Sequence, residues 1–188
     1  LYDITGPKMK LLLDFPTIGE PHYAQAIEAS KIRNEQLKFF KLADNKHPYV
    51  ARSEQEVGIS RKGKVVHVKM TAIRSHFAPD NLEGIQQGDT VLFHVTNLEQ
   101  DWDVPHGFAA MGSANDAELL IMPGQTRTLK WVAKYPGVYP FYCTDFCSAL
   151  HQEMQGYVRV APSGSMVALS ATTSRKSQQA FAATTGGK

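Results

Sequence analysis

The twelve residues from Cys143 to Met154 contain both cysteines of the chain, together with His151. Thiolate and thioether sulfurs are soft donors that favour copper over magnesium, calcium or manganese, and imidazole suits a metal that cycles between Cu(I) and Cu(II). A further candidate ligand, His106, lies upstream in the phrase DVPHGF. These residue types predict a copper site formed by one distant histidine and a Cys, His, Met cluster on a single loop.

The second cysteine decides which kind of copper site is predicted. A mononuclear blue-copper site uses one cysteine, two histidines and a weak axial methionine, which would leave Cys147 without a role. Two thiolates spaced by four residues can instead bridge two copper ions, each with one imidazole, from His106 or His151, and one weak ligand. Protein donors would then fill every position, whereas a catalytic metal keeps one open for water or substrate. The pattern therefore favours electron transfer over bond chemistry at this metal.

This donor pattern resembles the dinuclear CuA centre shared by nitrous oxide reductase and cytochrome c oxidase subunit II. The resemblance rests on the spacing Cys-x3-Cys-x3-His-x2-Met after an upstream histidine. It implies a ligand set that comprises His106, Cys143, the main-chain carbonyl of Asp145, Cys147, His151 and Met154. Many relatives have tryptophan or glutamate in place of Asp145. Because the donor there is backbone oxygen, we expect the metal to tolerate this difference.

The wider sequence resembles the reductase more closely than the oxidase. The phrases LLDFPTIGEPH (12–22), HGF (106–108) and YCTDFCSALH (142–151) carry this resemblance. In that family the Gly-Glu-Pro-His segment closes a β-propeller and supplies the last histidine ligand of the catalytic copper-sulfide cluster, CuZ. By this resemblance His22 is a CuZ ligand. The other propeller histidines would precede Leu1, so the chain by itself lacks most of the CuZ ligands.

The resemblance also implies a function and its partners. Electrons would come from a cytochrome c or a small copper protein, pass through CuA and reach CuZ, where nitrous oxide becomes dinitrogen and water. In that family CuA serves the CuZ of the partner subunit, so we expect a homodimer, located in the periplasm. No Cys-x-x-Cys-His motif is present, so the chain is expected to hold no haem.

The elements that must position the ligands have the pattern of β-strands. Between residues 65 and 72, Val66, Val68 and Met70 alternate with polar residues, which predicts one buried and one solvent-facing side. Residues 90–97 alternate in the same way, and further strand-like segments follow, separated by Gly and Pro turns, at 126–133, 137–142 and 156–160. With the resemblance, this predicts an all-β fold, a cupredoxin Greek-key β-sandwich over residues 61–162.

The flanking segments differ in composition from this domain. Residues 1–60 pass from an apolar stretch through a charged, helix-compatible run at 24–42 to a polar connector. We expect the end of an N-terminal β-propeller and a linker, with little regular structure or a short helix. Residues 163–188, rich in Ser, Thr, Ala and Gly, offer little surface to bury and are expected to form a flexible tail.

Composition limits the classes of partner. The formal charge is +2 with acidic and basic residues mixed, so no basic stripe points to nucleic acid. No apolar run approaches the roughly 20 residues that a membrane-spanning helix needs. The acidic side chains of Asp101, Asp103, Asp116 and Glu118 could steer a basic cytochrome c, although a solvated loop is the plainer interpretation.

Each feature also has a plainer alternative. The cysteines could form a disulfide or lie apart as buried thiols, and Met154 could fill the core. His106 could be a surface histidine and His22 a turn histidine. The remaining histidines and the tryptophans default to surface or packing roles; they are His47, His67, His76, His94, Trp102 and Trp131. For the whole chain, the alternatives are a soluble CuA domain of cytochrome c oxidase subunit II or a non-catalytic copper-binding module.

Overall fold

The computed structural model describes residues 2–3, 10–11, 40–101, 104–112 and 118–174. The chain divides into two compact units, residues 1–36 and 37–188. In the first unit two short strands, β1 (Tyr2–Asp3) and β2 (Lys10–Leu11), pair in antiparallel fashion. His22 and most of the helix-compatible run, residues 24–39, lie outside the described residues.

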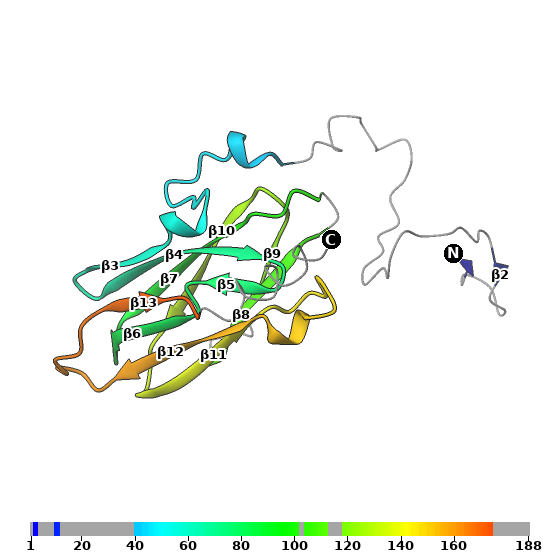
Figure 1. Cartoon of the computed structure of the whole chain (residues 1–188). Coiled ribbons are helices and arrows are strands. Elements are labelled where there is room, and N and C mark those ends of the chain that lie inside the picture. The colour runs from blue at the N-terminus through cyan, green and yellow to red at the C-terminus, as the bar shows by residue number, and fades with distance from the viewer. Residues whose placement is uncertain (1, 4–9, 12–39, 102–103, 113–117, 175–188) are drawn as a thin grey trace, which may run out of the picture. The chain divides into compact units, whose positions relative to one another are not determined.

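The second unit contains two β-sheets, whose strands are labelled in Figure 1. The first sheet consists of β3 (Gly58–Lys62), β4 (Val65–Ile73), β5 (His76–Ala78), β7 (Thr90–Asn97) and β10 (Thr126–Val132). The second sheet consists of β6 (Asn81–Gln86), β8 (His106–Ala110), β9 (Glu118–Ile121), β11 (Gly137–Tyr142), β12 (Gln155–Ala161) and β13 (Ser170–Thr172). Three 3-10 helices are also described: η3 (Leu42–Asp44), η4 (Glu54–Glu56) and η6 (His151–Glu153).

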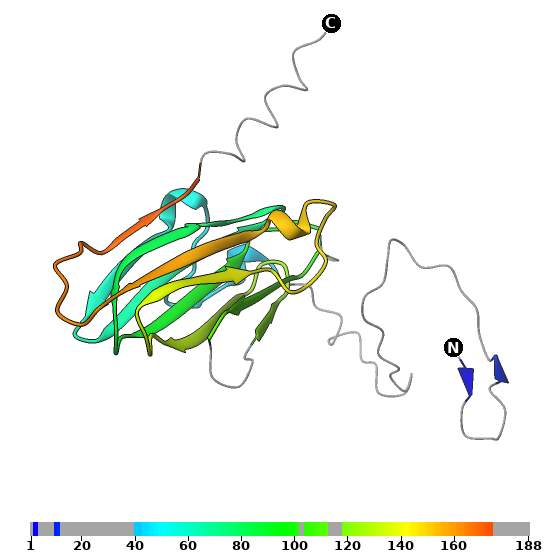
Figure 2. The same ribbon diagram turned by 90° about the horizontal axis from the view of Figure 1, so that it is seen from below.

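The order of the strands shows that the chain crosses repeatedly between the sheets. Along the first sheet the order is β10-β7-β4-β3, with β5 also paired to β4, and along the second it is β13-β6-β12-β11-β8-β9. Two neighbouring pairs are parallel, β4 with β7 and β6 with β12, and the other pairs are antiparallel. Figure 2 shows the two sheets as facing layers. The predicted Greek-key cupredoxin sandwich is confirmed.

Alternating side chains from both sheets form the core. Val66, Val68 and Met70 of β4 are fully buried, as their spacing predicted. Phe93 of β7 faces Phe108 of β8, with ring centroids 5.3 Å apart, and Phe141 of β11 lies 5.5 Å from Phe108. Such aromatic pairs each add about 0.5–1.5 kcal/mol beyond the burial of their surface. This packing fixes β8, which begins with His106, and β11, which leads into the predicted copper loop.

A segment before the sandwich is fastened to the outer face of the first sheet. This strap, residues 41–57, contains η3 and η4. Asn45 Nδ2 donates to Thr126 Oγ1 at 2.8 Å, and the backbone N–H of Ala51 donates to Thr96 Oγ1 at 3.1 Å. Thr96 and Thr126 point away from the core because they alternate with its inward-facing residues.

The ordered sheets extend beyond both ends of the predicted range 61–162. β3 begins at Gly58, which pairs with Lys69 of β4, and the pairing continues to Lys62 opposite Val65. β13 falls in the segment expected to be a flexible tail, yet it pairs with β6 and places Ala171 against the core. The expectation rested on the low apolar content of residues 163–188. An edge strand of three residues can form by backbone pairing without many apolar side chains. Within the described part of the chain, no helix is long and apolar enough to cross a membrane.

Candidate metal centre

Two strands and one loop bring the predicted donors to one end of the sandwich. His106 is the first residue of β8, and Cys143 follows directly after β11. Because β11 runs antiparallel to β8, the chain that continues past Tyr142 passes alongside His106. The loop then returns through η6, which begins at His151, and the backbone N–H of Cys143 donates to the carbonyl oxygen of Met154 at 3.0 Å. This bond closes the loop against the start of β8.

Gly107 permits the close approach of the loop to β8. A Cβ atom at this position would meet Thr144 Oγ1 and lie 2.7 Å from the backbone nitrogen atoms of Thr144 and Asp145. Backbone atoms of a closed loop cannot easily move away, so only glycine fits here. The N–H of Gly107 also donates to the sulfur of Cys143. In the phrase HGF, histidine offers a donor, glycine makes room for the loop, and Phe108 fills the core.

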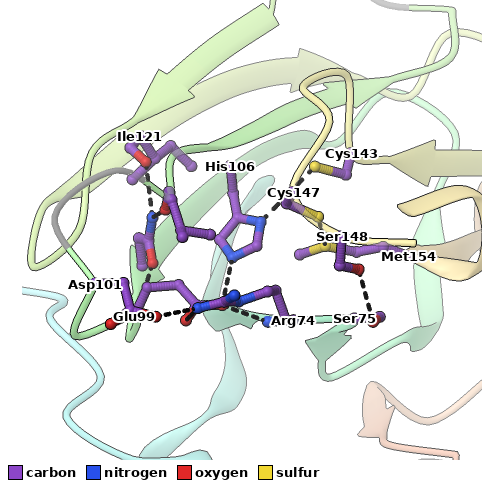
Figure 3. A network of polar contacts seen from close by, with 12 residues as sticks. Arg74, Ser75, Glu99, Asp101, His106, Ile121, Cys143, Cys147, Ser148 and Met154 are labelled. Carbon is purple, nitrogen blue, oxygen red and sulfur yellow. Dashed lines mark hydrogen bonds and ion pairs between the residues drawn. The ribbon is translucent and has the colours of Figure 1, made fainter. Parts of the chain in front are cut away.

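Five donor side chains converge at this end of the sandwich. His106 Nδ1 lies 3.9 Å from Cys143 Sγ. Cys147 Sγ lies 3.8 Å from His151 Nδ1 and 3.7 Å from Met154 Sδ. The ligand atoms of His106, Cys143 and Cys147 all lie within 4.8 Å of one another. Figure 3 shows the ring of His106 turned toward both cysteines.

These separations suit a shared metal. A metal with bonds of about 2.0 Å to imidazole nitrogen and about 2.3 Å to thiolate sulfur, as at zinc, holds the two donors roughly 3.5 to 4 Å apart. The observed nitrogen-to-sulfur distances of 3.9 and 3.8 Å fall in this range. The carbonyl oxygen of Asp145 lies 3.2 Å from Cys143 Sγ and adds a weak donor. Sulfur and imidazole donors in this combination fit copper.

Both cysteines are free thiols, so the disulfide alternative is wrong for the structure. Cys143 is 4% exposed and Cys147 is 8% exposed. Hydrogen bonding between the two thiols raises the pKa of Cys143 and lowers the pKa of Cys147 to about 4. The pair therefore releases its first proton readily and retains its second. A bound cation would supply the positive charge that lets both sulfurs exist as thiolates.

The second ring nitrogen of His106 faces a buried carboxylate. His106 Nε2 lies 3.3 Å from Glu99 Oε1, and the Glu99 side chain is only 7% exposed. Arg74 holds this carboxylate with its backbone N–H at 2.7 Å and its guanidinium at 3.2 Å, and the same guanidinium pairs with Asp101. These contacts orient the ring so that Nδ1 faces the sulfurs, as partners of metal-bound histidines do.

The pKa values follow from this ion pair. Burial raises the pKa of Glu99, but hydrogen bonds from His106 and Arg74 outweigh burial and lower the pKa to about 2. Burial lowers the pKa of His106, but hydrogen bonds to Cys147 and Glu99 outweigh it, so the pKa is raised overall. The hydrogen bonds that Arg74 donates to Glu99 raise the pKa of Arg74. Glu99 is therefore a carboxylate throughout the physiological range.

The sequence interpretation missed three contributors to the site. Arg74 and Glu99 form the ion pair behind His106, and Ser75 Oγ lies 3.1 Å from Ser148 Oγ, which ties the cysteine loop to the region of β5. The only signal in the sequence was an acidic residue seven positions before a predicted ligand. Nothing in the spacing indicates that Arg74 faces it.

The site adjoins the surface of the protein. A cleft of about 500 Å³ is lined by Tyr142, Cys143, Thr144, His151, Gln152, Met154 and Gln155. Tyr142, Phe146 and Leu150 are 41%, 43% and 58% exposed around it. The partly exposed ring of Phe146 lies 5.8 Å from that of His151.

The other residues considered in the sequence lie elsewhere. His47 of the strap is connected through Thr128 to His94 and His67 of the first sheet, and His94 is buried. His76 pairs with Glu54 at 2.6 Å. The remaining described candidates take ordinary places: Trp131 lies in the core and Glu118 is exposed at the start of β9. Trp102, Asp103 and Asp116 lie outside the described residues.

Comparisons with known proteins identify relatives of the chain. No family model matches the chain. The nitrous-oxide reductase of Stutzerimonas stutzeri is 35% identical over 173 residues, which cover 86% of this chain and 26% of that protein. The nitrous-oxide reductase of Cupriavidus necator is 36% identical over 155 residues, which cover 82% of this chain and 23% of that protein. The chain thus spans about a quarter of the length of these relatives.

More distant proteins match smaller portions of the chain. Cytochrome c oxidase subunit 2 of Thermus thermophilus is 32% identical over 93 residues, which cover 50% of this chain and 64% of that protein. Among solved structures, a heme-copper terminal oxidase dimer gives a TM-score of 0.48 at 24% identity, covering 62% of this chain and 74% of that one. Auracyanin B gives a TM-score of 0.42 at 14% identity, covering 56% of this chain and 95% of that one.

The similarity to the reductases covers most of the chain, including the sandwich with its soft-donor site. Two buried free thiols, flanked by imidazole and thioether donors, occupy the end of that sandwich. Over most of its length the chain is therefore similar to nitrous-oxide reductases, and it is a CuA-type electron-transfer domain with a cupredoxin fold.

Proposed function

We propose that the chain binds two copper ions as a dinuclear CuA centre and forms the electron-transfer part of a nitrous-oxide reductase. The observation that supports this most directly is the pairing of two adjacent free thiols, Cys143 and Cys147, each with its own imidazole 3.9 or 3.8 Å away. One thiolate would suffice for a mononuclear blue-copper site. A second, equally buried thiol has a role only if the sulfurs bridge two ions.

Each donor side chain would have its own role in the copper centre. Cys143 and Cys147 would hold both ions, and His106 and His151 would each bind one, while Met154 would act as a weak axial ligand together with the Asp145 carbonyl. When bound, the copper pair supplies one-electron redox chemistry. The ion pair of Glu99 and Arg74 keeps the His106 ring in place whatever the charge on the metal.

Rigid packing supports electron transfer over a distance. Phe108 and Phe141 are fully buried beneath the donors and exclude water from the core side. Gly107 and the backbone bond from Cys143 to Met154 fix the cysteine loop to β8. Donors held in this way move little when an electron arrives, so little reorganisation opposes the transfer.

In the whole protein, we expect electrons to come from a cytochrome c or a small copper protein and to reach CuZ, where nitrous oxide is reduced to dinitrogen and water. His22 is our candidate for a CuZ ligand within this chain. We further propose a periplasmic homodimer in which CuA of one subunit serves CuZ of the other. The names of the relatives support the reduction of nitrous oxide as the reaction of the whole protein.

Copper reconstitution tests the proposed centre. The chain should bind two copper ions and give a seven-line mixed-valence electron paramagnetic resonance spectrum, because one electron spin is shared by two copper nuclei. Cys147→Ser should bind fewer ions and give the four-line spectrum of a single copper. A four-line spectrum from the unaltered chain would contradict the dinuclear assignment.

Nitrous oxide turnover tests where catalysis occurs. The copper-loaded chain by itself should reduce no nitrous oxide, even with a strong electron donor, because the other CuZ ligands are expected outside it. The matching whole protein should be active. Turnover by the isolated chain would overturn the assignment of catalysis to CuZ.

The second candidate is a CuA domain of cytochrome c oxidase subunit II. Its support is the 32% identity to the Thermus thermophilus subunit, but that similarity covers 50% of the chain, against 86% for the reductase of Stutzerimonas stutzeri. The adjoining gene sequence distinguishes the two. Histidine-rich propeller repeats upstream would identify the reductase, and a membrane hairpin there would identify the oxidase.

A further inference from the structure

Three histidines outside the metal centre form a connected group between the strap and the first sheet. His67 projects from β4 and His94 from β7, and His47 belongs to the strap. His94 is 3% exposed, although histidine in a strand usually reaches solvent. Tyr49 of the strap covers two of the rings, with centroids 4.7 Å from His67 and 4.0 Å from His94.

The contact between His67 and His94 is a hydrogen bond and not a metal site. His67 Nδ1 lies 3.0 Å from His94 Nε2. The rings are nearly parallel, at 12°, with centroids 5.3 Å apart. Rings in one plane with facing nitrogens have this centroid separation. An ion between them would need about 4 Å from nitrogen to nitrogen, two bonds of about 2.0 Å.

The partners at both ends of the group allow one continuous chain of hydrogen bonds between neutral rings. The backbone N–H of Tyr49 donates to His47 Nδ1 at 3.1 Å, so a neutral His47 carries its proton on Nε2. His47 Nε2 then donates to Thr128 Oγ1 at 3.3 Å, and the Thr128 hydroxyl is able to donate to His94 Nδ1 at 2.8 Å. In this arrangement His94 carries its proton on Nε2 and donates it to His67 Nδ1.

The link to the strap is complete only while His47 is neutral. A proton added to His47 Nδ1 would face the N–H of Tyr49, which replaces that hydrogen bond with two opposed donors. The Thr128 hydroxyl has two lone pairs, so it can rotate and accept a hydrogen bond from a protonated His94. Protonation of His94, which is 3% exposed, is opposed by the burial of its charge.

The surrounding charges do not favour protonation. Lys69 of β4 is in register with His94, and its ammonium group pairs with Glu56 of η4 at 3.4 Å. Lys130 of β10 lies on the same face, two residues from Thr128. Within the part of the chain that the structure describes, no carboxylate hydrogen-bonds to the three rings. Burial lowers the pKa of His47, and burial followed by repulsion from the other two histidines lowers the pKa of His94 to about 4.

We propose that the neutral histidines, joined through Thr128, form a pH-sensitive clasp that holds residues 47–49 of the strap on the sheet and opens as the solution becomes acidic. The flanking bonds of Asn45 and Ala51 involve no titrating group, so the opening is local and leaves the sandwich folded.

Amide exchange in the copper-loaded, fully reduced chain tests the clasp, because Cu(I) is diamagnetic and permits nuclear magnetic resonance. After correction for intrinsic exchange rates, protection of the Tyr49 amide should fall between pH 6.5 and 4 by up to about tenfold per pH unit, the slope for uptake of one proton. Protection of the β4 and β7 amides should stay constant. Unchanged protection at Tyr49, or a parallel loss in the strands, would overturn the proposal.

A matched pair of variants tests the connection through Thr128. Thr128→Val keeps the branched shape but removes the hydroxyl, so Tyr49 protection at pH 7.5 should fall about fivefold, the equivalent of one hydrogen bond. Thr128→Ser keeps the hydroxyl and should resemble the unaltered chain. Nitrogen-15 shifts should also show His47 with the proton on Nε2. Wild-type protection in Thr128→Val, or a proton on Nδ1 of His47 at pH 7.5, would refute the clasp.

Discussion

Glu99 lies behind His106, with its Oε1 3.3 Å from Nε2 of the ring, while Nδ1 of the same ring faces Cys143 Sγ at 3.9 Å. The imidazole is thus held between a carboxylate and the sulfurs. Arg74 secures the carboxylate from its other side. The alignment of His106, a proposed copper ligand, therefore depends on residues that would not themselves touch the metal.

Glu99→Gln should weaken copper binding by about 10- to 100-fold, the usual effect of removing the partner of a metal-bound histidine. The amide keeps the size of the side chain but removes the charge that Arg74 and His106 share. A competition titration with a copper chelator measures the change. Asp101→Asn is the matched control, because Asp101 contacts the same arginine but its side chain is 66% exposed. Equal affinities for Glu99→Gln and the unaltered chain would show that the carboxylate does not support the ligand.

Gly107→Ala should destabilise the fold by about 1–3 kcal/mol, the usual cost of an added methyl group in a packed site. The new methyl group would meet the backbone of Thr144 and Asp145, so the cysteine loop must move away from β8. Urea unfolding measures the loss, and copper titration measures the effect on the site. Gly58→Ala is the control, because nothing lies within 4 Å of a Cβ atom there. Similar stabilities for the two variants would argue against the tight loop contact.

Met154→Leu should leave two copper ions bound but change the reduction potential of the centre. Leucine has nearly the volume of methionine, so the buried position, which is 1% exposed, stays filled. Only the thioether donor, 3.7 Å from Cys147 Sγ, is lost. Protein-film voltammetry measures the potential, and copper analysis checks the stoichiometry. An unchanged potential would mean that Met154 fills the core without binding metal.

Lowering the pH should decrease the free energy of unfolding through His94, at pH values above the pKa of most carboxylates. The pKa of His94 is about 4 in the folded chain and 6.5 in the reference state, so the unfolded chain binds the proton more tightly. Stability is therefore full above pH 6.5 and declines as the pH falls toward 4, by about 2–3 kcal/mol. Urea unfolding across this range should show the decline, and His94→Gln should reduce it. An equal slope in both proteins would show that another group titrates.

The spacing of residues predicted the parts of the molecule that are local along the chain. The cysteine loop carries four donor side chains within twelve residues, from Cys143 to Met154, so their proximity needs little tertiary structure. Strand β4 was predictable because its alternating residues bury one face whatever the partner strand. The edge strand β13 was not, because its three residues carry no pattern of their own and are held by pairing with β6.

Contacts between distant segments were decided only by the tertiary structure. Glu99 and Arg74 are 25 residues apart, and the clasp joins His47, His67, His94 and Thr128 from four separate segments. Strand register and the path of the strap determine these contacts, and neither leaves a periodic signal in the sequence. The amino-acid types thus determined which metal the loop can hold. Packing across the sandwich decided how His106 is oriented and how His67 and His94 come together with His47.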